Sequence, residues 1–151
     1  MWLAIGAGGW ALSRTRAESR GWRCACATIV RTYVLNTFLK LLVRRPRPQL
    51  PGLPALAPTP TQLSFPSAHA STSFAGALAY SRLGAPAGAL YALAGSLSLS
   101  RLYLGLHYPS DVLAGAVLGS CVAARRAGGA KRGGACAGSG AGEAADEASE
   151  R

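Results

Sequence analysis

Apolar residues along this chain gather into long stretches, separated by short segments rich in basic residues or proline. The longest apolar stretch, 24–43, is long enough to cross a bilayer as a helix, although Arg31, Asn36 and Lys40 interrupt it. Such polar residues within a span normally face protein or a water-filled cavity. Later stretches predict helices rich in Ala, Gly and Leu over 70–83, 87–106 and 109–124. The first stretch, 1–12, is apolar but too short to cross alone.

Small residues recur within the later predicted helices, at Gly76, Gly95, Gly115 and Gly119. The last two form a G-x-x-x-G arrangement, which lets membrane helices approach closely. We therefore expect an all-α fold, an integral membrane bundle of four to five helices.

Most of the nine prolines fall within 46–66, where neither a helix nor a central strand is plausible. This segment predicts an extended, Pro-rich loop at the membrane surface. Two further crossings after the loop would bring residues near 107 back to the side on which the loop lies. Residues near 40, 69 and 107 are therefore expected at one face of the bundle.

Charge narrows the class of protein. Sixteen Lys and Arg against six Asp and Glu give a formal net charge of +10, yet no polar helix face or aromatic platform is visible that would present those cations to nucleic acid. Basic residues beside apolar spans are typical of membrane proteins instead. The mean hydropathy of +0.21 is modest, because Ala and Gly replace larger apolar residues and the C-terminal end is polar. Membrane lipids are thus expected partners and nucleic acid is not, while no pattern indicates an oligomeric state.

Basic residues also predict the orientation in the membrane. The face opposite the loop carries Arg14, Arg16, Arg20, Arg23, Arg82 and the basic cluster of 125–132. Positive charge favours the cytoplasmic side, so we expect a plasma-membrane protein whose reactive residues lie on the extracytoplasmic face.

The C-terminal segment, 127–151, consists of small and charged residues without apolar periodicity, and it predicts a disordered tail after a domain of residues 1–126. The cysteines show neither CxxC nor zinc-ligand spacing, and we interpret them as packing residues or free thiols. No metal or cofactor is expected.

One acidic residue stands out. Asp111 is the only Asp or Glu between Ser19 and Gly142, in a largely apolar region where a carboxylate needs a defined partner. His107, four residues earlier, is the expected partner. Pro109 suits the first turn of a helix, so Asp111 would lie in that turn and hold imidazole Nδ1–H, leaving Nε2 free to react.

Three motifs carry the chemistry: K-x6-R-P over 40–48, P-S-A-H over 66–69 and S-R-x5-H-x3-D over 100–111. Together they supply cations, a hydroxyl, two imidazoles and a carboxylate, which suit a phosphoryl group. Lys40 and Arg47 would share one face if their helix continued to about Arg45. Ser67 and the amides after it open a helix, where unpaired N–H groups favour an anion.

In their order and spacing, the three motifs resemble the type 2 phosphatidic acid phosphatase and vanadium haloperoxidase superfamily, over about residues 32–119. The resemblance implies a metal-free phosphatase with a phosphohistidine intermediate. It implies that His107 is the nucleophile, that Asp111 orients it, and that His69 protonates the leaving oxygen and later activates water. It implies a phosphate-binding set of Lys40, Arg47, Ser67, Ala68 and Arg101.

The chain departs from that family in two ways. Ala68 stands where the family usually has glycine, and the usual membrane members have six spans, whereas this chain shows four and a fragment. Arg44 and Arg45 fall outside the signature, and we interpret them as headgroup-binding or interfacial anchors.

The resulting hypothesis is a membrane lipid phosphatase acting on a phosphate monoester or pyrophosphate at the outer leaflet. Candidate substrates are polyprenyl phosphate or pyrophosphate, phosphatidic acid and phosphatidylglycerophosphate. A membrane phosphotransferase would use the same residues and stays open, as does a degenerate lipid-binding member. A vanadate-dependent haloperoxidase resembles soluble proteins with an extra histidine near the site, and this chain has neither feature.

Overall fold

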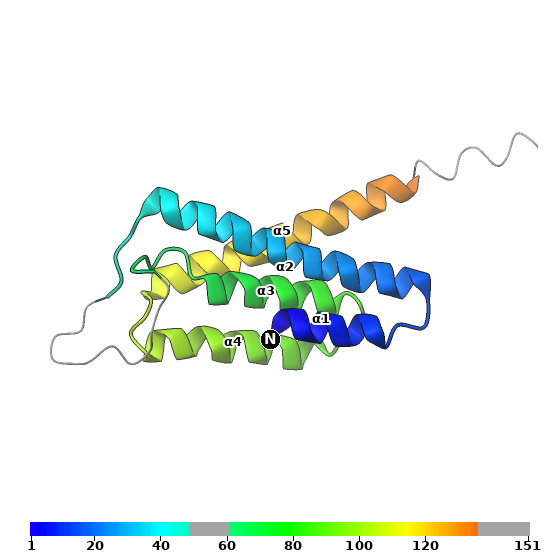
Figure 1. Ribbon diagram of the computed structural model, residues 1–151, viewed down its shortest axis with the longest axis horizontal. Helices are drawn as coiled ribbons and strands as arrows, with labels where there is room; N and C mark the ends of the chain where they lie inside the picture. The colour runs from blue at the N-terminus through cyan, green and yellow to red at the C-terminus, as the bar shows by residue number, and fades with distance from the viewer. Residues whose placement is uncertain (49–60, 136–151) are drawn as a thin grey trace, which may run out of the picture.

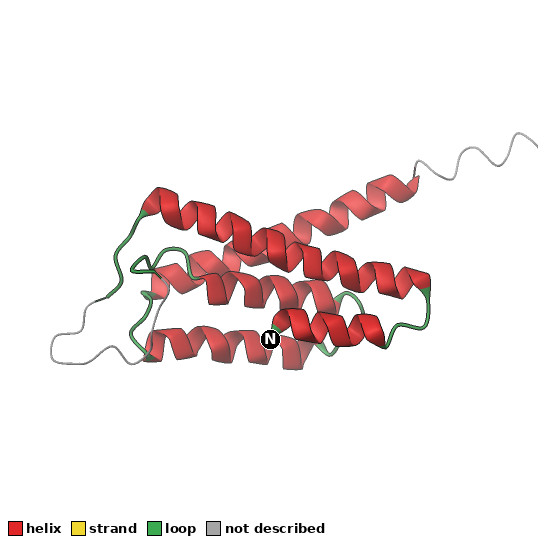
Figure 2. Ribbon diagram, in the orientation of Figure 1, coloured by secondary structure: helices red, strands yellow, loops and turns green. Residues whose placement is uncertain are grey.

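The computed structural model describes residues 1–48 and 61–135, and side chains as far as Arg125. Over these residues the fold is all-helical, apart from an isolated bridge between Pro46 and Leu63 (Figures 1 and 2). The helices are α1 (Trp2–Ala11), α2 (Arg16–Val43), α3 (Ala68–Ser81), α4 (Ala87–Tyr103) and α5 (Pro109–Ala135). The predicted all-α bundle is therefore confirmed.

Helix α2 begins well before the apolar stretch that predicted it. The Thr15 hydroxyl accepts a hydrogen bond from the Glu18 amide at 3.1 Å, and the Glu18 carboxylate accepts one from the Thr15 amide. This capping box satisfies N–H groups that the first turn leaves unpaired, so the helix can start at Arg16. It ends at Val43, where Arg44 takes the left-handed conformation with φ of 51°.

Helix α5 is longer than expected. It continues to Ala135, past the predicted helix end at 124 and into the segment from 127 for which a disordered tail was predicted. The remainder of the predicted tail, 136–151, and the centre of the Pro-rich loop, 49–60, lie outside the described residues.

Helix α3 is the centre of the bundle, because it contacts each of the other helices and packs most extensively against α5 (Figure 1). The short α1 is attached to α3 by two buried hydrogen bonds. Trp2 Nε1 donates to Ser73 Oγ at 2.9 Å, and the Tyr80 hydroxyl donates to the Trp2 carbonyl at 2.7 Å. The indole ring also stacks on Tyr80 at 6.2 Å between centroids. The apolar N-terminal stretch is thus part of the core.

Close helix approach depends on glycine at three of the four predicted positions. A Cβ at Gly115 would lie 2.6 Å from the Ser67 carbonyl oxygen, and one at Gly119 would meet the Ser71 carbonyl. A Cβ at Gly76 would lie 2.5 Å from the Trp2 ring. The prediction for Gly95 was wrong, since a Cβ there meets no atom within 4 Å.

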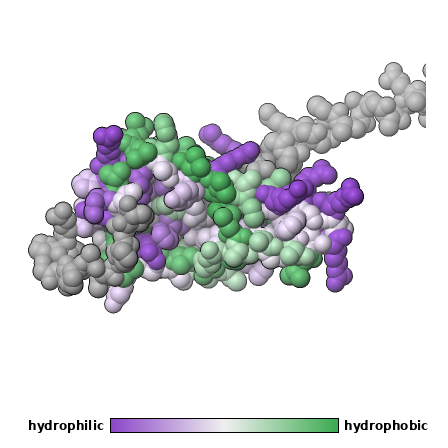
Figure 3. All heavy atoms as spheres, viewed as in Figure 1, coloured by the Kyte–Doolittle hydropathy of each residue, from purple (hydrophilic) through white to green (hydrophobic). Residues whose placement is uncertain are grey.

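The structure supports the membrane prediction more narrowly than the sequence did. In the part of the chain that is described, α2 is the one helix that is both long and apolar enough to cross a bilayer. Helix α3, with 14 residues, has the predicted length but begins two residues earlier, and α4, with 17 residues, is shorter than predicted. Large apolar side chains of α2 are exposed, among them Val34, Phe38 and Leu42. On the face seen in Figure 3, hydrophobic residues cover the middle of the molecule and hydrophilic ones gather mainly toward its ends.

The α3–α5 contact yields the first prediction. Replacing Gly119 by Ala should destabilise the fold by about 1–3 kcal/mol, because the added methyl meets backbone rather than a flexible side chain. The matched control is Gly95→Ala, which adds the same methyl to open space and should be neutral or stabilising. Thermal unfolding in detergent measures both variants. Equal melting temperatures would contradict the close approach.

Candidate functional site

The three sequence motifs meet at one end of the bundle, formed by the end of α2, the first turn of α3 and the connection from α4 to α5 (Figure 1). Hydrogen bonds join the three segments. Lys40 Nζ donates to the Leu63 carbonyl at 3.3 Å, and Arg47 Nη1 donates to the Leu106 carbonyl at 2.8 Å. The predicted convergence on one face is therefore present in the fold.

Asp111 lies at the centre of these connections and is fully buried. Its Oδ1 accepts a hydrogen bond from Arg45 Nη1 at 2.9 Å, and its Oδ2 accepts one from the Tyr108 amide at 2.9 Å. The Asp111 main-chain carbonyl accepts from the Ser67 amide at 3.0 Å. As predicted, Pro109 begins α5 and places the carboxylate in its first turn. A buried carboxylate with these partners is fixed in position.

His107 lies beside this carboxylate and is 6% exposed. Its Nδ1 is 3.8 Å from Asp111 Oδ2, which is longer than a hydrogen bond, so the predicted bond between them is not formed. Among the described residues, Nδ1 has no hydrogen-bond partner. The imidazole therefore lies next to the carboxylate without a hydrogen bond to it.

Burial lowers the pKa of His107 to about 4, and the charges of Arg47 and Lys40 act in the same direction. The Ser64 carbonyl and Asp111 act in the opposite direction but more weakly. His107 is therefore neutral at physiological pH and retains a nucleophilic nitrogen lone pair.

The two cations of the first motif reach the site differently from the prediction. Because α2 ends at Val43, Arg47 lies beyond the helix and shares no helix face with Lys40. The Arg47 guanidinium is instead held by the loop, with Nε donating to the Thr61 carbonyl at 2.9 Å. Lys40, in the last turn of α2, and Arg47 still act together, since both charges influence His69 and His107.

The start of α3 presents backbone donors. Ser67 is the N-cap, and its hydroxyl accepts from the Ala70 amide at 3.5 Å. In the described structure no hydrogen-bond partner is recorded for the amides of Ala68 and His69, which occupy the first turn. Unpaired amides at a helix N-terminus favour an anion. The methyl of Ala68 is accommodated half-buried in this turn.

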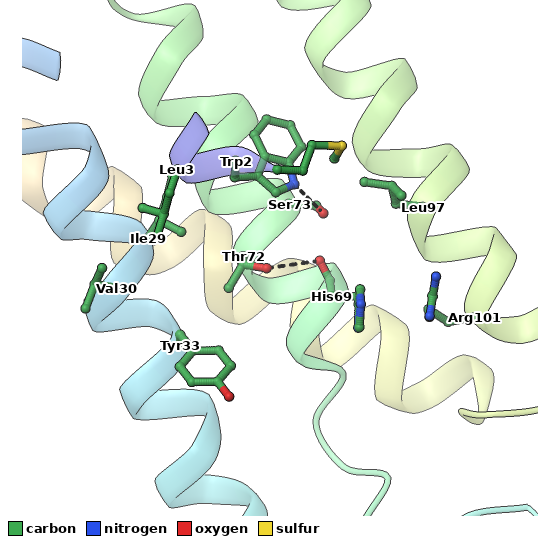
Figure 4. A pocket seen from close by; sticks show the side chains of 11 residues that line it. Trp2, Leu3, Ile29, Val30, Tyr33, His69, Thr72, Ser73, Leu97 and Arg101 are labelled. Atoms are coloured by element: carbon green, nitrogen blue, oxygen red, sulfur yellow. Dashed lines mark hydrogen bonds between the residues drawn. The ribbon is translucent and has the colours of Figure 1, made fainter. Parts of the chain in front are cut away.

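A pocket of about 460 Å³ opens beside His69 and Arg101. Figure 4 shows these two side chains at one end of the pocket, while Trp2 and Ser73 lie at the other. Arg101 Nε is buried and has no hydrogen-bond partner among the described residues. The remaining wall is mainly apolar, from Leu3, Ile29, Val30 and Leu97. An anionic group at His69 can thus continue into an apolar chain within one site.

Sequence reasoning missed two residues of this region. Arg45 was interpreted as an interfacial anchor, yet it binds Asp111 and lies 4.1 Å from the centroid of the Tyr108 ring. Asn36 is fully buried, and its Nδ2 donates to the Pro66 carbonyl at 3.3 Å, which positions the turn before α3. The sequence did contain a signal for Asn36, because a polar residue inside an apolar span is expected to face protein.

Comparison with known proteins agrees with this geometry. The family model described as the PAP2 superfamily matches residues 21–128. The chain belongs to the PAP2 superfamily. The PAP2 assignment confirms the resemblance found in the motifs and the predicted enzyme class, a phosphatase.

Similar PAP2 proteins include a decaprenylphosphoryl-5-phosphoribose phosphatase of Mycobacterium tuberculosis, 42% identical over 125 residues that cover 82% of this chain and 68% of that protein. The decaprenylphosphoryl-5-phosphoribose phosphatase of Mycolicibacterium smegmatis is 43% identical over 115 residues, which cover 76% of this chain and 62% of that protein. Among solved structures, a transmembrane PAP2 type phosphatidylglycerolphosphate phosphatase from Bacillus subtilis matches with a TM-score of 0.63 and 25% identity, covering 87% of this chain and 67% of that one.

The unpaired Arg101 Nε predicts a role in oxyanion binding by this PAP2 chain. Arg101→Gln should weaken inhibition by orthovanadate roughly 10- to 100-fold, because hydrogen bonds to charged groups contribute about 1.5–3 kcal/mol. Arg125→Gln, an exposed arginine of α5, is the matched control and should leave inhibition unchanged. Isothermal titration of detergent-solubilised protein with vanadate measures both. Equal affinities for Arg101→Gln and wild type would contradict this role.

Proposed function

We propose that this protein is a metal-independent membrane phosphatase that hydrolyses a phosphate monoester on a polyprenyl-linked lipid through a phosphohistidine at His107. One observation carries the proposal. A neutral, buried imidazole lies beside the fixed carboxylate of Asp111, and the charges of Lys40 and Arg47 act on it and on His69. Two imidazoles that share the same cations suit an in-line displacement at phosphorus.

The reaction divides into two steps. His107 Nε2, on the ring edge opposite Nδ1, attacks the phosphorus and forms a P–N bond while the bond to the leaving oxygen breaks. His69 in its protonated form donates a proton to that oxygen and releases the alcohol. Burial and the nearby cations lower the pKa of His69, and the negative charge of the bound phosphoryl group opposes them and favours the protonated form. A water molecule then gives its proton to His69 and attacks the phosphorus, the P–N bond breaks, and orthophosphate leaves. Asp111 stabilises the positive charge that His107 carries while it is phosphorylated.

The surrounding donors stabilise the charge on the equatorial phosphate oxygens. Lys40, Arg47 and Arg101 supply fixed positive charge, and the Ser67 hydroxyl with the amides of Ala68 and His69 supplies hydrogen bonds. Lys40 and Arg47 are held in place without substrate. Lys40 donates to the Leu63 carbonyl, and Arg47 donates to the carbonyls of Thr61 and Leu106. Such preorganisation lowers the cost of reaching the charged transition state.

The substrate class follows from the pocket and the relatives. The apolar wall beside His69 suits the lipid chain of a substrate whose phosphate monoester lies at the polar end of the pocket. The relatives with 42–43% identity are named as acting on a decaprenyl-linked phosphoribose, whereas the protein named for phosphatidylglycerolphosphate is 25% identical. A polyprenyl-linked phosphate is therefore favoured over polyprenyl pyrophosphate, phosphatidic acid and phosphatidylglycerophosphate.

The orientation belongs to the same proposal. The site lies at one end of the bundle, and the turn after α1 with its arginines lies at the other (Figure 1). The positive-inside rule supports a cytoplasmic position for this arginine-rich end, and we therefore propose that the phosphatase site faces the extracytoplasmic side of the plasma membrane.

A substrate panel tests the function directly. Purified protein should release phosphate from decaprenylphosphoryl-5-phosphoribose faster than from decaprenyl pyrophosphate, phosphatidic acid or phosphatidylglycerophosphate, and chelator should leave the rate unchanged. His107→Ala should abolish release while remaining folded and membrane-bound. Undiminished turnover by His107→Ala would contradict the covalent mechanism, and transfer of the phosphate to an added alcohol instead of water would indicate a phosphotransferase.

The acidity of His107 predicts the pH dependence. Because its pKa is lowered to about 4, the acidic limb of kcat/KM that reports this residue should lie near pH 4, well below the ordinary histidine value of about 6.5. Activity is thus retained as pH falls through 6 and is lost only when His107 becomes protonated. Lys40→Met should move this limb upward, because the lysine charge helps to lower the pKa. A limb that stays in place in Lys40→Met would contradict this electrostatic assignment.

A further inference from the structure

Arg45 is the one side chain of the described structure that forms an ion pair with Asp111 at hydrogen-bond distance. Its Nη1 lies 2.9 Å from Asp111 Oδ1 and 2.8 Å from Ser110 Oγ, and its guanidinium carbon lies 4.1 Å from the centroid of the Tyr108 ring. The side chain is about one third exposed, so it closes over the carboxylate from the solvent side. Two hydrogen bonds and a stacked ring hold it there.

These contacts divide the two carboxylate oxygens of Asp111 between different partners. Arg45 takes Oδ1, while Oδ2 accepts from the Tyr108 amide and is the oxygen 3.8 Å from His107 Nδ1. Without a cation on Oδ1, a fully buried carboxylate would have an unsatisfied oxygen, and rotation or protonation would relieve it. Either change would remove Oδ2 from its place beside the imidazole. The ion pair therefore determines which oxygen His107 meets.

We infer that Arg45 is a positioning residue, which holds Asp111 so that its Oδ2 faces His107 Nδ1 across 3.8 Å, where the negative charge favours the imidazole tautomer that carries its proton on Nδ1. Arg45 acts through the carboxylate and makes no contact with the phosphoryl group. A planar guanidinium is suited to this task, because it can bind the carboxylate and Ser110 together while it stacks on Tyr108. Lysine, with a single ammonium, can reproduce the charge but not the full set of contacts.

The expected loss of kcat rests on the proposed function, whereas the expected change at the His107 imidazole does not. Arg45→Gln should lower kcat on the order of 10- to 100-fold, as a misdirected catalytic group does, on the lipid phosphate that wild type hydrolyses fastest. Competitive inhibition by orthophosphate, a ground-state ligand that forms no bond to His107, should change less than about twofold, since uniform binding is untouched. Arg45→Lys should recover part of kcat. Arg44→Gln is the matched control, because the neighbouring Arg44 donates to its own helix at Leu41 and does not touch Asp111.

A second measurement needs no turnover. The chain has two histidines, so imidazole nitrogen NMR signals are assigned by the single substitution His69→Gln. Wild type and Arg44→Gln should give the same His107 signals, with Nδ1 protonated and Nε2 not. Arg45→Gln should shift both nitrogens in the same sense as Asp111→Asn. Unshifted His107 signals in Arg45→Gln would overturn the inference.

The kinetic measurements also test whether Arg45 is a positioning residue. A wild-type kcat in Arg45→Gln would overturn the positioning role. A loss seen only as weaker orthophosphate binding would overturn it too, because Arg45 would then be a direct oxyanion ligand. Failure of the wild-type protein to hydrolyse any lipid phosphate would instead overturn the proposed function, and the NMR comparison would still test Arg45.

Discussion

A fully buried carboxylate is the constraint on which this structure depends. The Asp111 carboxylate must find partners away from water, and it accepts hydrogen bonds from Arg45 after α2 and from the Tyr108 amide before α5. The main-chain carbonyl of the same residue, Asp111, accepts from the Ser67 amide before α3. Each partner belongs to a different sequence motif or its flank. Asp111 therefore does more than neighbour His107, because the hydrogen bonds of its carboxylate and of its main-chain carbonyl together join the three segments that carry the site residues.

The bundle behind the site makes this convergence possible. Helix α3 lies among all the other helices, and small residues allow its backbone to approach that of α5 closely at Gly115 and Gly119. The first turn of α3 is thereby brought against the first turn of α5, where Asp111 lies. Close packing in the bundle and hydrogen bonding at its end thus act on the same contact. The geometry of the site is a consequence of the helix packing.

Much of this arrangement could be predicted from the sequence, because helices and motif spacing are local signals. Apolar stretches gave the helices, and Pro109 correctly placed Asp111 in a first turn. Contacts between residues far apart in the sequence were harder to predict. Arg45 lies outside the family motif, and nothing local indicated that it meets a carboxylate 66 positions later. The capping box at Thr15 was readable but is a polar signal ahead of the apolar stretch, and the place of Trp2 in the core depended on tertiary packing.

The account combines a PAP2 fold, a neutral nucleophilic imidazole and a cation cluster that acts on both histidines. Its most direct test is a structure of the protein with orthovanadate bound. The account predicts vanadium bonded to His107 Nε2, with His69 on the opposite side and Lys40, Arg47 and Arg101 around the equatorial oxygens. Vanadate bound elsewhere, or coordinated without His107, would contradict it.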